Sequence, residues 1–311
     1  MRTAATLVLA LLVCPALLAQ DDLATFKAEV NLVLLDATVR DRQGRVMTDL
    51  GKDDFRLLED GREQRIQYFS RDELPLAIAL VLDVSGSMKP TFAQLRRSMV
   101  YALDRLRPTD RAVLFAFSRD TERLTGLTSN HDQLADAMES VSARGGTDIL
   151  DALWAASVYL KQQAPKDRRA VILISDNIAP KRAEHGTKEV IETALEFETE
   201  VHSLCVCNMP LGYALRFTQP AFARVNVSKI VKATGGALTK TGSDQTLIEA
   251  LGQTLTRLRQ RYTLGYTPDK RKDARPGQFH RVEIRLSPQI GKPGDDYTVS
   301  ARSGYYTPST P

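Results

Sequence analysis

Long apolar runs alternate with amphipathic segments through the middle of the chain. Three runs contain no charged position: Leu76–Leu82, Ala112–Phe117 and Ala170–Ile174. Such continuous runs are typical of strands buried on both faces of a parallel sheet. Between and after them we expect a strand at Val201–Val206 and helices at Phe92–Leu106, Leu134–Met138, Ile149–Leu160, Lys188–Glu200 and Gln245–Gln260. This order predicts an α/β fold with a doubly wound, mostly parallel sheet that helices cover on both sides.

Strand and turn signals dominate both flanks of this central region. Strands are expected at Val30–Val39, Phe55–Glu59, Ile66–Phe69, Tyr262–Tyr266, His280–Leu286, Tyr297–Ser300 and Gly304–Tyr306. Asp60-Gly61 separates two apolar runs and predicts a hairpin. Because neither flank has enough strands for a stable sheet, we expect the two flanks to form one small β-sandwich.

The N-terminus has the pattern of an export signal. Arg2 precedes an apolar run from Leu7 to Ala19, and polar residues follow from Gln20. The run is shorter than the roughly 20 residues that span a bilayer. We therefore expect cleavage after Ala19 and a periplasmic or secreted protein without a membrane span. The alternative is a lipoprotein anchor at Cys14, although the residue before that cysteine fits a lipoprotein box poorly.

These patterns divide the chain into four expected parts. Residues 1–19 form the signal peptide, and residues 20–74 form an N-terminal β segment. Residues 75–262 form the α/β domain, and residues 263–311 form a C-terminal β segment.

Composition adds two restrictions. The 311 residues are 43% hydrophobic and 26% charged, which is ordinary for a globular protein. The formal net charge of +4 is small for this length and disfavours a dedicated nucleic-acid binder.

Cys205 and Cys207 lie two positions apart in an expected strand. We expect buried thiols there, since a disulfide bridge over so short a span would distort the strand.

Oxygen-bearing side chains follow two of the buried strands. Five residues share this placement or begin a helix beside it: Asp83, Ser85, Ser87, Thr147 and Asp176. If the two strands are neighbours, all five groups meet at the carboxyl edge of the sheet, where open α/β sheets bind ligands. Carboxylates and hydroxyls without imidazole or thiolate suit Mg²⁺, with Mn²⁺ or Ca²⁺ as alternatives. The competing interpretation is that these residues only cap loops and the helix that begins near Phe92.

The same five residues, in this order, resemble the metal-ion-dependent adhesion site of von Willebrand factor type A domains. The resemblance covers Leu76 to about Arg261. The flanks are similar to an acidobacterial-type group of bacterial von Willebrand A-related proteins at Asp54-Phe55, Glu59-Asp60-Gly61, Tyr262–Tyr266 and Gly304–Tyr306. The resemblance implies a Rossmann-like fold and a divalent cation that completes its coordination with an acidic side chain of a protein partner. It also implies movement of the last helix, here Gln245–Gln260, on binding.

The sequence therefore favours an exported, adhesion-type binding protein that is not an enzyme. No Gly-x-Ser-x-Gly elbow or P-loop occurs, and the four histidines lack metal-ligand spacing. Two alternatives stay open: a scaffold subunit of an envelope assembly, and a metal-dependent hydrolase.

Overall fold

The computed structural model describes residues 32–71, 74–180, 183–206, 222–241, 244–268, 275–290 and 297–307. The expected signal peptide and Cys207 lie outside these residues. Within them, no helix combines the length and the apolar character that a membrane crossing requires.

A six-stranded sheet forms the centre of the α/β region. Its strands run in the order β12 (Leu238–Thr241), β10 (Thr199–Val206), β8 (Arg168–Ser175), β5 (Leu76–Asp83), β6 (Arg111–Phe117) and β7 (Thr121–Arg123). All neighbours are parallel except β7, which pairs antiparallel with β6. Every residue of β5 and β8 is buried, as the apolar runs predict for central strands.

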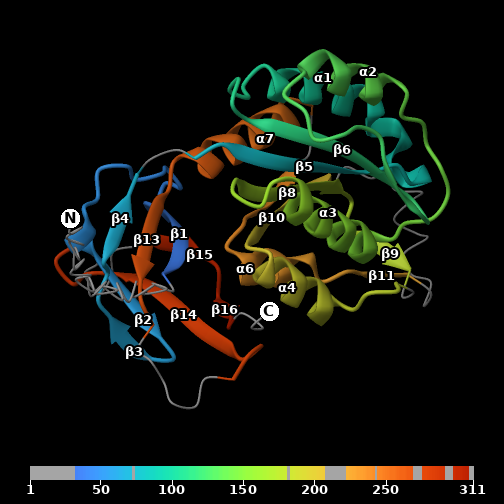
Figure 1. Cartoon of the computed structure of the whole chain (residues 1–311). Coiled ribbons are helices and arrows are strands. Elements are labelled where there is room, and N and C mark those ends of the chain that lie inside the picture. The colour runs from blue at the N-terminus through green and yellow to red at the C-terminus, as the bar shows by residue number, and fades with distance from the viewer. Residues whose placement is uncertain are drawn as a thin grey trace, which may run out of the picture. The chain divides into compact units, whose positions relative to one another are not determined.

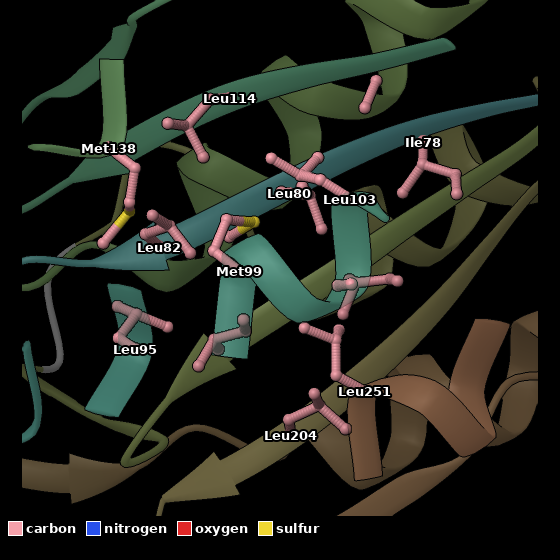
Figure 2. Packing of buried hydrophobic residues seen from close by; sticks show 14 of the residues in the cluster. Ile78, Leu80, Leu82, Leu95, Met99, Leu103, Leu114, Met138, Leu204 and Leu251 are labelled. Atoms are coloured by element: carbon pink, nitrogen blue, oxygen red, sulfur yellow. The ribbon is translucent and has the colours of Figure 1, made fainter. Parts of the chain in front are cut away.

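Helices cover both faces of this sheet (Figure 1). One face carries α1 (Phe92–Leu103), α2 (His131–Glu139) and α7 (Asp244–Arg259), and the other carries α3 (Ile149–Gln163), α4 (Thr187–Glu196) and α6 (Val227–Thr234). On the first face Leu95, Met99 and Leu103 of α1 belong to one buried apolar cluster with residues of β5 and with Leu251 of α7 (Figure 2). The predicted doubly wound α/β fold is confirmed.

The chain departs from the predicted elements in several places, including strands β9 (Ile178–Pro180) and β11 (Phe222–Arg224), which pair antiparallel and were not expected. Helix α1 ends at Leu103 and α4 at Glu196, three and four residues earlier than expected. After α4, Glu198 adopts a left-handed backbone (φ 49°) that turns the chain into β10. Helix α6 and strand β12 form in a stretch for which we predicted neither.

The flanks form two antiparallel four-stranded sheets. One has the order β15 (Thr298–Ala301), β1 (Val33–Arg40), β13 (Tyr262–Tyr266) and β4 (Tyr68–Ser70). The other has the order β16 (Gly304–Tyr306), β14 (Phe279–Leu286), β2 (Phe55–Glu59) and β3 (Arg62–Gln64). Each sheet combines strands from both flanks, and one apolar core lies between them. The predicted flanking β-sandwich is confirmed, and Asp60-Gly61 makes the β2–β3 turn with φ 48° and 81°.

Arg261 lies between α7 and β13 and is buried. Its guanidinium Nη1 is 2.7 Å from Glu200 Oε2 in β10 and 3.2 Å from Asp36 Oδ2 in β1. Burial alone would raise the pKa of Glu200, but Arg261 and His202 lower it to about 2. The ion pair therefore joins the parallel sheet to the first strand of the sandwich.

Candidate metal centre

The two predicted carboxylates lie side by side because their strands are neighbours. Strands β5 and β8 pair in parallel from Leu76 to Leu82, and Asp83 and Asp176 follow at the same edge. Asp83 is fully buried, and Asp176 is 5% exposed. The order of strands in the sheet thus converts two distant sequence positions into one polar site.

A chain of hydrogen bonds connects four of the five predicted residues. Ser85 Oγ lies 3.0 Å from Ser87 Oγ, and Ser87 Oγ donates to Asp176 Oδ2 at 2.7 Å. Ser85 also donates its backbone N–H to Asp83 Oδ1 at 2.9 Å. The loop after β5 therefore folds back toward the end of β8 and brings two hydroxyls beside two carboxylates.

Thr147 lies on a loop that is anchored beside this cluster. Arg144 N donates to Val84 O at 2.7 Å, and Asp148 N donates to Ser118 O at 2.6 Å. Gly146, with φ 89°, packs so tightly that an added Cβ would lie 2.9 Å from Arg119 Cβ. Among the hydrogen bonds of the described residues, none joins Thr147 to the other four predicted ligands.

Capping accounts for only part of this arrangement. Asp83 Oδ1 accepts from Ser85 N, and Asp176 Oδ1 accepts from Ile178 N at 2.9 Å, so one oxygen of each carboxylate stabilises its own loop. The 3₁₀ helix η2 (Gly86–Thr91) begins after Ser85, whose hydroxyl makes no capping bond to it. The serine hydroxyls instead contact each other and Asp176.

The electrostatics of the cluster suit a cation. Burial and the nearby Asp176 carboxylate together raise the pKa of Asp83 to about 7, against the opposing effect of hydrogen bonds from Ser175 and Ser85. No ion pair among the described residues includes Asp83. A bound divalent cation would supply the missing positive charge.

The donor set also restricts which cation fits. Nowhere in the described part of the chain do three or more His, Cys, Asp or Glu side chains form a group that could hold a metal. A cation here would rely on two carboxylates and neutral hydroxyls, an oxygen-only set that fits Mg²⁺ and other hard cations. Cys205 is buried, and its Sγ lies 3.9 Å from the backbone oxygen of Asp176.

Sequence reasoning missed two residues of this site. Ser175 is fully buried and donates its hydroxyl to Asp83 Oδ2 at 2.6 Å. Asn177 adopts a left-handed backbone with φ 60° immediately after Asp176. The sequence did contain a signal for these two residues: a serine and an asparagine flank an aspartate at the end of a predicted strand.

Comparisons with known proteins agree with this fold. Residues 78–178 match the family model of the von Willebrand factor type A domain. A search of curated proteins finds no match.

Three solved structures illustrate the similarity. An aerotolerance-related membrane protein from Bacteroides fragilis is 19% identical over 58% of this chain and 99% of its own, with a TM-score of 0.46. A von Willebrand factor type A protein from Catenulispora acidiphila is 13% identical over 85% of this chain and 76% of its own, with a TM-score of 0.48. Proximal thread matrix protein 1 from the mussel byssus is 16% identical over 66% of this chain and 50% of its own, with a TM-score of 0.49.

Proposed function

We propose that this chain, whose residues 78–178 match the family model of the von Willebrand factor type A domain, is an exported binding protein that recognises an acidic group of a protein partner through a divalent cation. The proposed cation is Mg²⁺, and the proposed ligands are Asp83, Ser85, Ser87, Thr147 and Asp176.

One observation supports this proposal above the others. Ser85, Ser87 and Asp176 form a continuous hydrogen-bonded chain beside the buried Asp83. A purely structural cluster would be expected to pair Asp83 with a cationic side chain, because an isolated buried carboxylate is costly. The two carboxylates and the two serine hydroxyls, with Thr147 on an adjacent loop, would instead supply oxygen ligands at the edge of the sheet where α/β proteins bind ligands.

Each side chain has a distinct role in the proposed recognition. Asp83 and Asp176 supply negative charge, while the hydroxyls of Ser85, Ser87 and Thr147 supply neutral oxygens. When bound, a cation with so few charged ligands keeps net positive charge and an exchangeable position that a partner's carboxylate can occupy. The loop that carries Ser85 and Ser87 orients these groups before the partner arrives.

We propose that the protein is not an enzyme. The carboxylates of Asp83 and Asp176 are themselves proposed ligands, so neither would be available as a general base once a cation is bound. The proposal of export is supported by the N-terminal sequence pattern and implies a partner outside the cytoplasm.

Titration calorimetry with MgCl₂ tests the cation site. We expect binding by the wild-type protein and none by Asp83→Ala. Asp120→Ala is the matched control, because Asp120 is an exposed carboxylate on the turn after β6, and it should bind as the wild type does. Equal affinity in Asp83→Ala and wild type would refute the assignment.

Pull-down from envelope extracts tests the partner. Contact through the cation is supported if the wild-type protein captures a partner, EDTA abolishes this capture, and the Asp83→Ala protein captures none. Capture that persists in EDTA and with Asp83→Ala contradicts it and favours a scaffold role.

A further inference from the structure

We propose that Ser175 is a positioning residue for the cation site, which holds the Asp83 carboxylate in its ligating orientation without touching the cation. This inference rests on the proposed function and extends it to a residue outside the five predicted ligands.

Ser175 is the last residue of β8 and is fully buried. Its Oγ donates to Asp83 Oδ2 at 2.6 Å and accepts the backbone N–H of Asn177 at 3.0 Å. A serine hydroxyl has only one proton to donate. Because Asn177 supplies a proton to the oxygen, the hydroxyl's own proton is directed to Asp83.

The backbone around Asp176 keeps that Asn177 N–H in place. Asn177 has φ 60°, a left-handed conformation that asparagine tolerates better than most residues. Its side-chain Nδ2 lies 3.2 Å from Ser203 Oγ in the neighbouring strand β10, and this contact is buried. The turn that presents Asp176 therefore also orients the hydroxyl that contacts Asp83.

The same network connects both carboxylates of the site. Ser175 bonds to Asp83 across the β5–β8 pair, while the turn it anchors carries Asp176, whose Oδ2 accepts from Ser87. With Ser85 N on Oδ1 and Ser175 Oγ on Oδ2, both Asp83 oxygens have a donor from the protein. These two bonds fix the rotation of a carboxylate that would otherwise have freedom about its last torsion.

Removal of a side chain that hydrogen-bonds to a metal ligand commonly changes the affinity of the site for its metal. Residues that hydrogen-bond to a ligand orient it and tune its charge, and their loss typically reduces metal affinity 10–100-fold. Removal of the Ser175 hydroxyl should therefore lower the affinity for the cation although every proposed ligand is still present.

The test compares three substitutions at this position by calorimetric titration with MgCl₂ and, separately, MnCl₂. We expect Ser175→Ala to lose affinity about 10–100-fold. Ser175→Thr keeps the hydroxyl and should recover most of the affinity. Ser175→Cys keeps nearly the same volume with a weaker donor, so an intermediate affinity is expected, and it replaces the threonine variant if the added methyl group prevents folding.

Ser157→Ala is the matched control. Ser157 is also fully buried, but its hydroxyl donates to Leu153 O within α3. Its removal should leave the affinity for both cations unchanged. Melting of every variant in EDTA shows whether the fold is intact.

The outcomes separate this inference from the proposed function. No cation binding by the wild type would defeat the proposed function itself. Wild-type binding with an unchanged affinity in a folded Ser175→Ala would overturn the positioning role alone. Equal losses in Ser175→Ala, Ser175→Thr and Ser175→Cys, all folded, would also overturn it, because packing and not the hydroxyl would then decide the affinity.

Discussion

Substitution of Asp83 by asparagine should stabilise the cation-free protein while it abolishes the effect of Mg²⁺. The Asp83 carboxylate is fully buried, and its pKa is raised from 3.8 to about 7 by burial and by Asp176. A group with a raised folded pKa of this kind is destabilising once it ionises, because the unfolded chain ionises it more easily. Asparagine keeps the shape and carries no charge.

The magnitude follows from this difference in pKa. Each tenfold change in the proton equilibrium is worth 1.36 kcal/mol, so the ionised Asp83 costs the cation-free fold at most about 4 kcal/mol above pH 7. The asparagine amide can still accept from Ser85 N, but its NH₂ group faces the Ser175 hydroxyl. A lost bond of this type costs about 1–3 kcal/mol. The expected net gain at about pH 8 is therefore about 1–3 kcal/mol.

Urea unfolding in EDTA at about pH 8 and about pH 5.5 measures this gain. As the pH falls below 7, the folded wild type protonates Asp83 and its disadvantage diminishes, so the advantage of Asp83→Asn should shrink or reverse at the lower pH. With MgCl₂ at about a hundredfold over Kd, the wild type should gain about 2.7 kcal/mol. Asp83→Asn should gain nothing.

Asp110→Asn is the control for this experiment. Asp110 is also buried, but it accepts hydrogen bonds from Leu76 N and Arg107 N and lies 2.8 Å from Arg259 Nη2. Its loss should destabilise the protein at both pH values and leave the gain from Mg²⁺ intact. If Asp83→Asn is less stable than wild type in EDTA at about pH 8, or gains as much from Mg²⁺, the reasoning fails.

Three further substitutions test other parts of the structure. Gly146→Ala forces a Cβ against Arg119 at a φ of 89°. It should strain the loop that carries Thr147 by about 1–3 kcal/mol and lower the Mg²⁺ affinity measured by calorimetry. An unchanged affinity would exclude that loop from the site. Leu251→Ala removes a fully buried side chain of α7 (Figure 2) and should cost about 2–5 kcal/mol in urea unfolding with no change in Mg²⁺ affinity. Arg261→Leu leaves Glu200 buried without its main cationic partner and should cost about 3–5 kcal/mol at neutral pH. Because the folded pKa of Glu200 is lowered from 4.5 to about 2, this cost should decline as the pH falls from 4.5 toward 2, and a pH-independent cost would contradict the assignment.

The sequence was most informative where burial imposes a simple pattern. Strands β5 and β8 are buried on both faces, so their apolar runs stood out without any alignment. Helix α6 was missed because its eight residues mix lysines with apolar positions. Its end signals were nevertheless present: Asn226 caps it through Lys229 N at 3.3 Å, and Gly235 ends it with φ 88°. Short helices are therefore better predicted from their caps than from their interior.

The site divides in the same way between predictable and unpredictable residues. Asp83, Ser85, Ser87 and Asp176 could be proposed as ligands from the sequence because each lies at the end of a recognisable strand or just after it. The hydrogen bond from Ser175 to Asp83 could not be predicted, since it depends on β8 lying beside β5 in a register that brings Ser175 Oγ to Asp83 Oδ2. Pairing between distant strands is a tertiary property that local patterns do not specify.

The position of Asp83 explains why a cation, and not a rearrangement, would relieve its charge. A carboxylate on an exposed loop can turn toward water, but Asp83 ends a strand whose eight residues are all buried, and both of its oxygens already have donors from the protein. Turning it outward would break those bonds and disturb the close packing of the central sheet. Because the rigid strand prevents the carboxylate from turning toward water, the electrostatic cost of its ionised form persists until a cation or a proton binds. The position of Asp83 at the end of the central strand thus keeps an electrostatic cost in the fold that a bound cation would relieve.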